Sequence, residues 1–455
     1  MDREALNVLL VVLEGARVDH LACAGYERDT MPFLDQVARE GVRFPQAFTC
    51  APSRLAAHAS LLTGLFPSLH GATEETRALA PAPRALPELL KAAGYRTAAF
   101  CPDPWISPAT GFGRGFDRFY TQHGEGRITG RAADYARRAS DRVLGRGDAG
   151  ARRSTHALLD WLRASPQPFF ALIHYREPLR PIRPPAPYDR AFPSPGLPET
   201  PVPAANEVVN GPPRQVSATE SAALAGLHDG ALRYADLRLK EIGDTLAAEH
   251  RWDRTLFIVT SSYGEDLGER GTLTALPGLC DAVLRVPLIL RCPGRIPAGF
   301  VVEEFAQPVD VLPTVAALTG CGLDAPVQGR ALLTASGATP GPRAVIAEAF
   351  RQAPGTGEAR VAAVDGYLSA VRRKVIRTRR EKFIWRSDEA NALFDLSRDP
   401  EERNDLAAAQ PERADRLRRV LFDWLAESER WSVTRDLARG DEGGWRALER
   451  QGAAE

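Results

Sequence analysis

The stretch Asn7–Asp19 reads NVLLVVLEGARVD, and it decides the fold. Residues 8–13 are all valine or leucine, which is typical of a strand buried on both faces of a parallel sheet. Polar residues follow directly, beginning with Glu14. In open α/β sheets the chemistry lies at the carboxyl ends of the strands. The sequence therefore predicts a buried strand that leads into a functional site.

Further apolar runs of strand length alternate with helical patterns along the chain. We expect parallel strands at residues 169–175, 255–260 and 286–291, and helices at residues 32–41 and 87–94. Each helical pattern has proline in its first turn and glycine at its end. With 455 residues and 44% hydrophobic content, the chain can bury a large core. The pattern predicts an α/β fold.

The pattern changes near residue 342. Strand-like runs at 344–350, 367–377 and 382–385 precede an amphipathic helix at 411–427. We predict a large α/β domain over 1–340, a smaller α+β domain with an antiparallel sheet and a helix over 341–427, and a polar tail over 428–455. The proline-rich stretch 177–213 is expected to form a surface loop beside the site.

Charge and composition exclude several classes of function. Lys plus Arg and Asp plus Glu are both 58, so no global field draws the protein to nucleic acid or to a membrane. The apolar stretch Val8–Leu13 is too short for a signal peptide, which favours a cytoplasmic location. The six cysteines lack metal-ligand spacing, so we expect most to be small buried apolar groups.

The motifs along the chain resemble the sulfatase family of the alkaline phosphatase superfamily. The similarity runs from about Asn7 to Leu425, and its segments keep their order; they include Gly41–Phe44, Ala59–Gly64, His174–Pro178, Arg285–Ile289 and Leu393–Leu396. The resemblance implies a large, mostly parallel sheet between helices, with a smaller C-terminal α+β domain. It also implies hydrolysis of sulfuric esters or related phosphate esters.

That family, as the resemblance implies, holds a divalent cation between acidic residues after the first strand, a pair of ligands after a late strand, and the nucleophile. Here the acidic pair reads Glu14-Gly15, and the late pair reads Ser262-Tyr263. Neither pair suits a hard cation, which prefers oxygen ligands such as carboxylates. A histidine that contacts substrate in the family is replaced by Leu179. We therefore expect no metal cofactor.

The nucleophile position admits two alignments. Counting without gaps between the flanking motifs places Arg54 there, with His58 in the position of a cationic helper. Arginine stays protonated and cannot attack. In the rival alignment, Cys50–Arg54 copies the C-x-P-S-R signature whose cysteine becomes formylglycine in sulfatases. That copy lies four residues upstream, about one 5.4 Å helical turn away, so we favour the ungapped alignment.

Structural roles are predicted for several of these residues. Glu14 is expected to pair with Arg54 across the former metal position, and the ring of Tyr263 to occupy ligand space. Ser53 is predicted to cap a helix that Gly64 ends. For the remaining histidines, His70 is assigned to a turn, whereas a structural and a functional role are equally open for His174.

Three hypotheses about function follow. The first is a catalytically silent, metal-free binding or regulatory protein that holds an anionic sulfate or phosphate ester through Arg54. The second is an active hydrolase with Cys50 as formylglycine, and with Ca²⁺ or Mg²⁺ held by rearranged ligands such as Glu14, Asp19, Glu265 or Asp266. The third is a non-catalytic subunit that pairs with an active homologue. The sequence leaves the natural ligand and the oligomeric state open.

Overall fold

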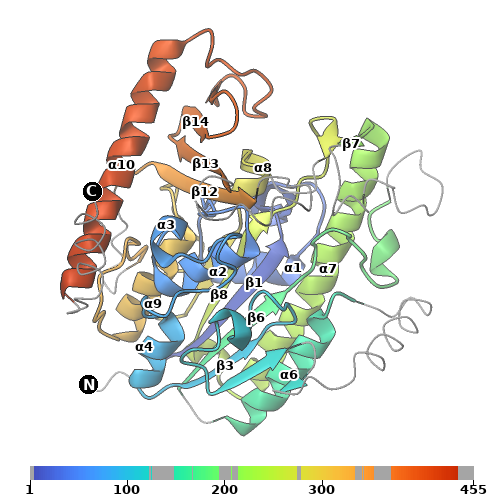
Figure 1. The fold of residues 1–455 in the computed structure, drawn as a ribbon. Helices are drawn as coiled ribbons and strands as arrows, with labels where there is room; N and C mark the ends of the chain where they lie inside the picture. The colour runs from blue at the N-terminus through green and yellow to red at the C-terminus, as the bar shows by residue number, and fades with distance from the viewer. Residues whose placement is uncertain are drawn as a thin grey trace, which may run out of the picture.

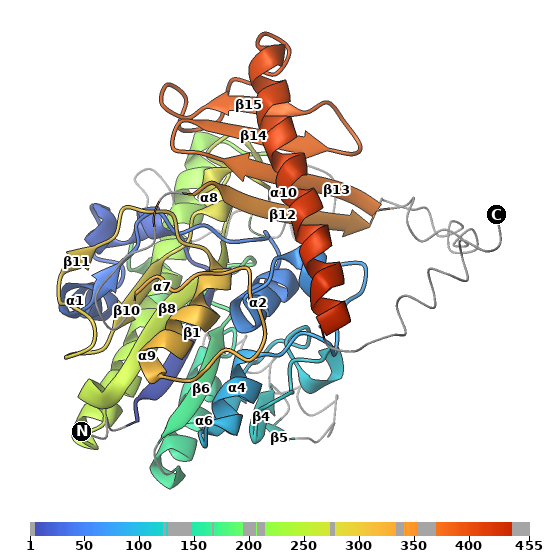
Figure 2. The same ribbon diagram turned by 90° about the vertical axis from the view of Figure 1, so that its left-hand side faces the viewer.

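The computed structural model describes residues 5–121, 124–125, 148–165, 168–193, 206, 214–273, 278–333, 341, 343–352 and 370–438. A large sheet lies between helices on both faces, and a smaller sheet covered by one long helix lies at one end of it (Figures 1 and 2). In the part of the chain covered by these ranges, no helix is long and apolar enough to cross a membrane.

The large sheet contains nine strands within the described ranges, in the order β11-β2-β10-β8-β1-β6-β3-β4-β5. Their bounds are β1 (Asn7–Gly15), β2 (Val42–Arg43), β3 (Arg96–Phe100), β4 (Arg118–Thr121), β5 (Gly124–Glu125), β6 (Phe169–Tyr175), β8 (Thr255–Gly264), β10 (Leu288–Arg291) and β11 (Phe300–Val301). The central strand β1 runs parallel to both β6 and β8, and β3 runs parallel to β6. The predicted α/β class is confirmed.

One predicted strand direction is wrong. β10 runs antiparallel to β8, with Leu288 opposite Thr260, whereas the sequence pattern predicted a parallel strand. The described chain between β8 and β10 contains the two-residue strand β9 (Thr272–Leu273) and a short helix, α8 (Asp281–Leu284), which contacts β8. The chain therefore turns back near the carboxyl end of β8. A short buried apolar run looks the same in either direction, so periodicity cannot assign it.

Alternating side chains of β1 face two different layers of helices. Val8, Leu10 and Val12 belong to the apolar cluster on the side of α2 (Arg54–Thr63), α4 (Leu86–Ala92) and α9 (Val311–Thr319). Leu9, Val11 and Leu13 belong to the cluster on the side of α1 (Pro32–Glu40), α6 (Ala151–Ala164) and α7 (Ala218–Ala248). Burial of each such side chain stabilises the fold by about 1.5–3 kcal/mol.

The smaller sheet is antiparallel and consists of β12 (Val345–Gln352), β13 (Ala370–Arg377), β14 (Glu381–Arg386) and β15 (Ala392–Asp395). The helix α10 (Pro411–Ala438) crosses it and packs Leu417 and Leu421 against Phe383 (Figure 2). The prediction ended this helix at residue 427, but its residues continue to 438 because the following sequence contains no helix breaker. Residues 439–455 of the predicted tail, and residues 367–369 of the predicted strand, lie outside the described ranges.

Shorter elements connect these layers. They are the helix α3 (Pro67–His70), the paired strands β7 (Arg214–Gln215) and β9 (Thr272–Leu273), and single 3₁₀ turns at Val18–His20, Ala22–Ala24, Pro108–Thr110, Tyr188–Arg190, Trp252–Arg254 and Pro308–Asp310. In residues 177–193 of the proline-rich loop, the described helical element is the 3₁₀ turn at Tyr188–Arg190; residues 194–205 and 207–213 of that loop lie outside the described ranges.

Candidate functional site

The candidate site lies where three neighbouring parallel strands end. Glu14 is the penultimate residue of β1, His174 lies in β6, and Tyr263 lies near the end of β8. Arg54 is the first residue of α2, which packs near β8. The structure thus brings together residues that the motifs had placed in the catalytic position.

The first turn of α2 is fixed by a helix cap. The hydroxyl of Ser53 accepts a hydrogen bond from the backbone nitrogen of Ala56 at 3.4 Å. Gly64 ends the helix with a left-handed backbone at φ 69°, so both predicted helix boundaries are confirmed. The cap determines where Arg54 enters the site, because the helix begins directly at this residue.

Arg54 bridges two buried carboxylates. Its Nε lies 3.0 Å from Oε1 of Glu14, which confirms the predicted ion pair. Its Nη1 donates to Oδ2 of Asp103 at 2.6 Å. The guanidinium of Arg176 lies 3.6 Å from the same Asp103 oxygen. Two arginines and two carboxylates therefore balance one another, and both carboxylates are fully buried.

Glu14 has further polar neighbours on its other side. The hydroxyl of Tyr263 donates to Oε1 at 3.3 Å, and Nε2 of His174 lies 3.3 Å from Oε2. Burial alone would raise the pKa of Glu14, but the charge of Arg54 and the contact with His174 outweigh it and lower the pKa to about 2. Glu14 is therefore ionised at neutral pH.

His58 lies one turn after Arg54 in the same helix. Its Nδ1–H donates to the carbonyl of Arg54 at 2.7 Å, and its ring meets that of His174 edge to face at 4.6 Å. Burial and the neighbouring His174 lower the pKa of His58 to about 3. His58 is therefore neutral at pH 7, unlike the cationic helper that the resemblance implies for this position.

An apolar cluster lies beside the end of β8. Leu179 packs in a cluster with Tyr263, Cys280 and Val283. Gly15 adopts φ 91°, and a Cβ at this position would lie 3.3 Å from the backbone nitrogen of Leu179. The prediction that the ring of Tyr263 occupies ligand space agrees with this packing.

These residues do not fit a divalent cation. The guanidinium of Arg54 already lies within hydrogen-bond distance of Glu14, and a dication at that carboxylate would be repelled by it. Gly15 offers no side chain, and Ser262 offers a neutral hydroxyl that is buried without a hydrogen-bond partner in the described part of the chain. The two carboxylates at this site, Glu14 and Asp103, are both paired with Arg54 and are therefore not free to act as ligands of a hard cation.

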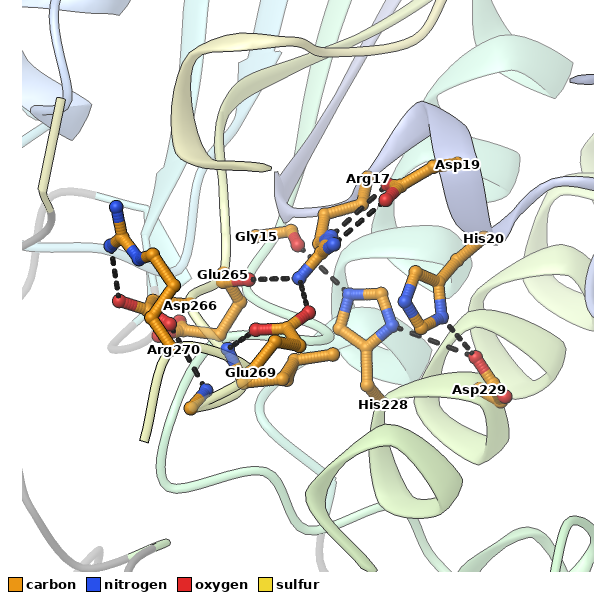
Figure 3. Close-up of polar contacts among 12 residues, drawn as sticks. Gly15, Arg17, Asp19, His20, His228, Asp229, Glu265, Asp266, Glu269 and Arg270 are labelled. Atoms are coloured by element: carbon orange, nitrogen blue, oxygen red, sulfur yellow. Dashed lines mark hydrogen bonds and ion pairs between the residues drawn. The ribbon is translucent and has the colours of Figure 1, made fainter. Parts of the chain in front are cut away.

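The carboxylates proposed as substitute ligands are engaged elsewhere. Asp19 pairs with Arg17 at 2.7 Å, Glu265 with Arg180 at 2.5 Å, and Asp266 with Arg270 at 3.2 Å. Figure 3 shows Asp19 and Asp266 directed toward their arginine partners. The described contacts of these three carboxylates do not include Glu14.

Cys50 lies in a different environment from Glu14. It is fully buried in an apolar cluster with Phe66, Ile346 and Phe383, where the small sheet meets the large domain. Burial raises the pKa of its thiol. All six cysteines are free and four of them are buried, in agreement with the prediction that most are small buried apolar groups.

Two residues of the site were not predicted from the sequence. Asp103 follows β3, and Arg176 directly follows β6. Both stand just after a strand of the large sheet, so the rule that led to Glu14 would also have pointed to them. His70 has the turn role that was predicted, because its Nδ1 accepts from the backbone nitrogen of Ala72 at 3.0 Å.

Comparison with known proteins agrees with this fold. The family model described as Sulfatase matches residues 6–321. A multifunctional alkaline phosphatase superfamily protein, PehA of Trinickia caryophylli, is 28% identical over 398 residues, which cover 72% of this chain and 76% of that protein. A sulfatase of Formosa agariphila is 23% identical and covers 69% of each chain.

Solved structures show the same fold. A phosphonate monoester hydrolase of Agrobacterium radiobacter superposes with a TM-score of 0.73 at 22% identity, over 94% of this chain and 96% of that chain. A putative sulfatase from Bacteroides thetaiotaomicron gives a TM-score of 0.72 at 16% identity, over 96% and 94%. The fold defines a protein of the alkaline phosphatase superfamily. Within that superfamily, the chain belongs to the sulfatase family.

Proposed function

We propose that this protein is a catalytically silent sulfatase-family member that binds an anionic sulfate or phosphate ester without hydrolysing it. The observation that carries the proposal is the position of Arg54. Its guanidinium bridges Glu14 and Asp103, where the resemblance implies a nucleophile and a cation. The positive charge that a metal would supply comes from the chain itself.

Ester hydrolysis needs an activated nucleophile, and the nearby hydroxyls are poorly suited to that role. The hydroxyl of Ser53 caps α2. Burial and the charge of Glu14 raise the pKa of the Tyr263 phenol well above its ordinary value. Arg54 itself stays protonated. These properties support binding rather than covalent chemistry.

The groups available to an anion are the outer N–H groups of Arg54 and Arg176. Their side chains are 27% and 33% exposed, whereas Glu14 and Asp103 beneath them are fully buried. A planar guanidinium suits the oxygens of a sulfate or phosphate ester. Because the buried carboxylates balance both charges, we expect hydrogen bonds to contribute more to binding than net attraction does.

One experiment tests both parts of this proposal, the absence of hydrolysis and the binding of an ester. Purified full-length protein is incubated with 4-nitrophenyl sulfate and with a phosphate diester, with added Ca²⁺ or Mg²⁺, while turnover and ester binding are both measured. We expect no turnover above background, and we expect Arg176→Gln to weaken ester binding about tenfold or more, since one charge-assisted hydrogen bond contributes about 1.5–3 kcal/mol.

Two variants serve as controls. Arg163→Gln removes an exposed arginine of α6 that pairs with Asp160, and it should leave ester binding unchanged. Turnover that depends on Ca²⁺ or Mg²⁺ and disappears in Glu14→Gln would contradict the proposal, because it would show a working metal site at Glu14. Formylglycine at Cys50, found by mass spectrometry together with turnover, would favour the hydrolase alternative.

A further inference from the structure

A second polar cluster lies behind the end of β1, separate from the pair of Glu14 and Arg54. His20 belongs to the 3₁₀ turn after β1, and His228 and Asp229 are neighbours in α7. His20 is 7% exposed, while His228 and Asp229 are fully buried. Figure 3 shows the two imidazole rings and the carboxylate directed toward one another.

The hydrogen bonds of His228 fix its tautomer. Its Nε2 lies 3.0 Å from the carbonyl oxygen of Gly15, which can only accept, so Nε2 carries the proton. The other ring nitrogen, Nδ1, therefore presents a lone pair. It is buried and has no hydrogen-bond partner within the described ranges. This nitrogen lies 3.8 Å from Oδ1 of Asp229.

The carboxylate of Asp229 is held in place by donors on its outer oxygen. Oδ2 accepts from the hydroxyl of Tyr26 and from Nη1 of Arg28, each at 2.8 Å. Oδ1 is thereby directed toward the histidines, and it lies 2.6 Å from Nδ1 of His20. One ligand atom from each of His20, His228 and Asp229 lies within 4.8 Å of the other two.

We propose that His20, His228 and Asp229 form a binding site for a divalent transition-metal ion of the zinc type. Two imidazoles and one carboxylate are a ligand set that such ions prefer. Ligands about 2.0–2.1 Å from a tetrahedral ion lie about 3.4 Å from one another. This value falls between the 2.6 Å and 3.8 Å that separate Asp229 Oδ1 from the two histidine nitrogens.

The surrounding hydrogen bonds match those that support metal ligands. A ligating histidine commonly donates its other N–H to a backbone carbonyl, as His228 does to Gly15. Ligating carboxylates are themselves hydrogen-bonded, as Asp229 is to Tyr26 and Arg28. When the ion binds, His20 coordinates through Nδ1, and the proton on that nitrogen moves to Nε2.

The local charge also permits a cation. Arg28 balances Asp229, and Arg17 pairs with both Asp19 and Glu269. Three carboxylates thus face two arginines, so these ion pairs leave a net negative charge beside the cluster. Without an ion, the cluster would be a hydrogen-bonded tether between the 3₁₀ turn and α7. That arrangement gives the buried Nδ1 of His228 no partner among the described residues.

Zinc binding to the full-length protein tests this site. Protein treated with a chelator is titrated with Zn²⁺ by calorimetry and with Co²⁺ by absorption spectroscopy, and we expect one ion per chain. His228→Gln keeps an amide donor near the position of Nε2 but removes Nδ1. His20→Asn keeps a donor toward Asp229 but removes the imidazole. Each variant should weaken binding at least tenfold, because each lacks one ligand.

The control is Glu14→Gln, which alters the family's metal position and should leave Zn²⁺ binding unchanged. Zn²⁺ should also raise the Tm of the unaltered protein and leave that of His228→Gln unchanged, which separates lost binding from lost folding. Absence of stoichiometric binding would overturn the proposal. So would binding that both histidine variants retain, or binding that Glu14→Gln abolishes.

Discussion

Arg54 supplies the positive charge that balances two buried carboxylates, Glu14 and Asp103. The change Arg54→Met removes the guanidinium and leaves the carboxyl group of Glu14 buried beside His174 and Tyr263 without its cationic partner. We expect the free energy of unfolding to fall by about 3 kcal/mol, the lower end for a broken buried pair because Arg54 is partly exposed. Urea unfolding at pH 7 measures this change.

A second variant tests whether the unpaired Glu14 carboxyl causes this loss of stability. The double change Glu14→Gln with Arg54→Met removes both charges, so it should recover part of the stability lost in the single variant. If Arg54→Met alone costs less than about 0.5 kcal/mol, the pair contributes nothing measurable and Arg54 does not stabilise Glu14.

Two buried histidines contribute to the pH dependence of the free energy of unfolding. Burial lowers the pKa of both His58 and His70 to about 3, below the ordinary value of 6.5. Between these values the unfolded chain binds protons that the folded chain does not. Each of these histidines therefore lowers the free energy of unfolding as pH drops from about 6.5 towards 3, by up to about 1.4 kcal/mol per pH unit. Glu14 adds to this loss only below its ordinary pKa of 4.5. Glu177 and Asp236, whose pKa values burial raises to about 8 and about 7, contribute in the opposite direction between those values and their ordinary pKa.

Urea unfolding at pH 7, 6 and 5 checks this slope. His70→Asn keeps an acceptor for the backbone nitrogen of Ala72 and removes one titrating ring, so the slope should decrease. His156→Gln, on the exposed face of α6, should not change it. An equal slope in His70→Asn and in the unaltered protein between pH 7 and 5 would mean that the buried His70 ring does not exclude its proton.

At the level of elements, the Ser53 cap fixes the start of α2 and thereby positions Arg54. Ser53→Ala removes the acceptor for Ala56 and should lower the free energy of unfolding by about 1 kcal/mol. Ser53→Asp supplies another capping oxygen and should therefore retain most of the stability that the cap contributes. Denaturant unfolding of both variants measures the difference. Equal losses in the two would show that the cap does not stabilise α2.

The sequence predicted the bounds and directions of some strands better than those of others. β6 has the predicted bounds, because its apolar run is bordered by Pro168 on one side and by Arg176 on the other. β1 and β8 run further than predicted, since Glu14 and Tyr263 stay within the sheet although they are polar. The direction of β10 could not be predicted, because it depends on where the chain turns and not on local periodicity.

The candidate site was predictable only in part, for a similar reason. Glu14 and Arg54 could be paired because motifs on both flanks fix their spacing along the chain. Asp103 and Arg176 come from other strand ends, and only the folded sheet brings them to the guanidinium. Contacts of this kind depend on the strand order, which the sequence pattern did not specify.

At the scale of the whole molecule, the position of Cys50 separates the two alignments of the nucleophile. Its carbonyl accepts from the backbone nitrogen of Glu348 in β12, and its side chain packs where the small sheet and α10 meet the large domain. The residue is therefore part of a domain contact. The ungapped alignment instead places Arg54 beside Glu14, where the three strands end.

The central claim is that an ion pair takes the place of the metal in this sulfatase-family fold. A crystal structure of the full-length protein, grown in the presence of Ca²⁺, tests it most directly. The claim predicts that the Arg54 guanidinium bridges Glu14 and Asp103, with Nε near 3.0 Å from the Glu14 carboxylate. A Ca²⁺ ion coordinated by Glu14, with Arg54 turned away from it, would contradict the claim.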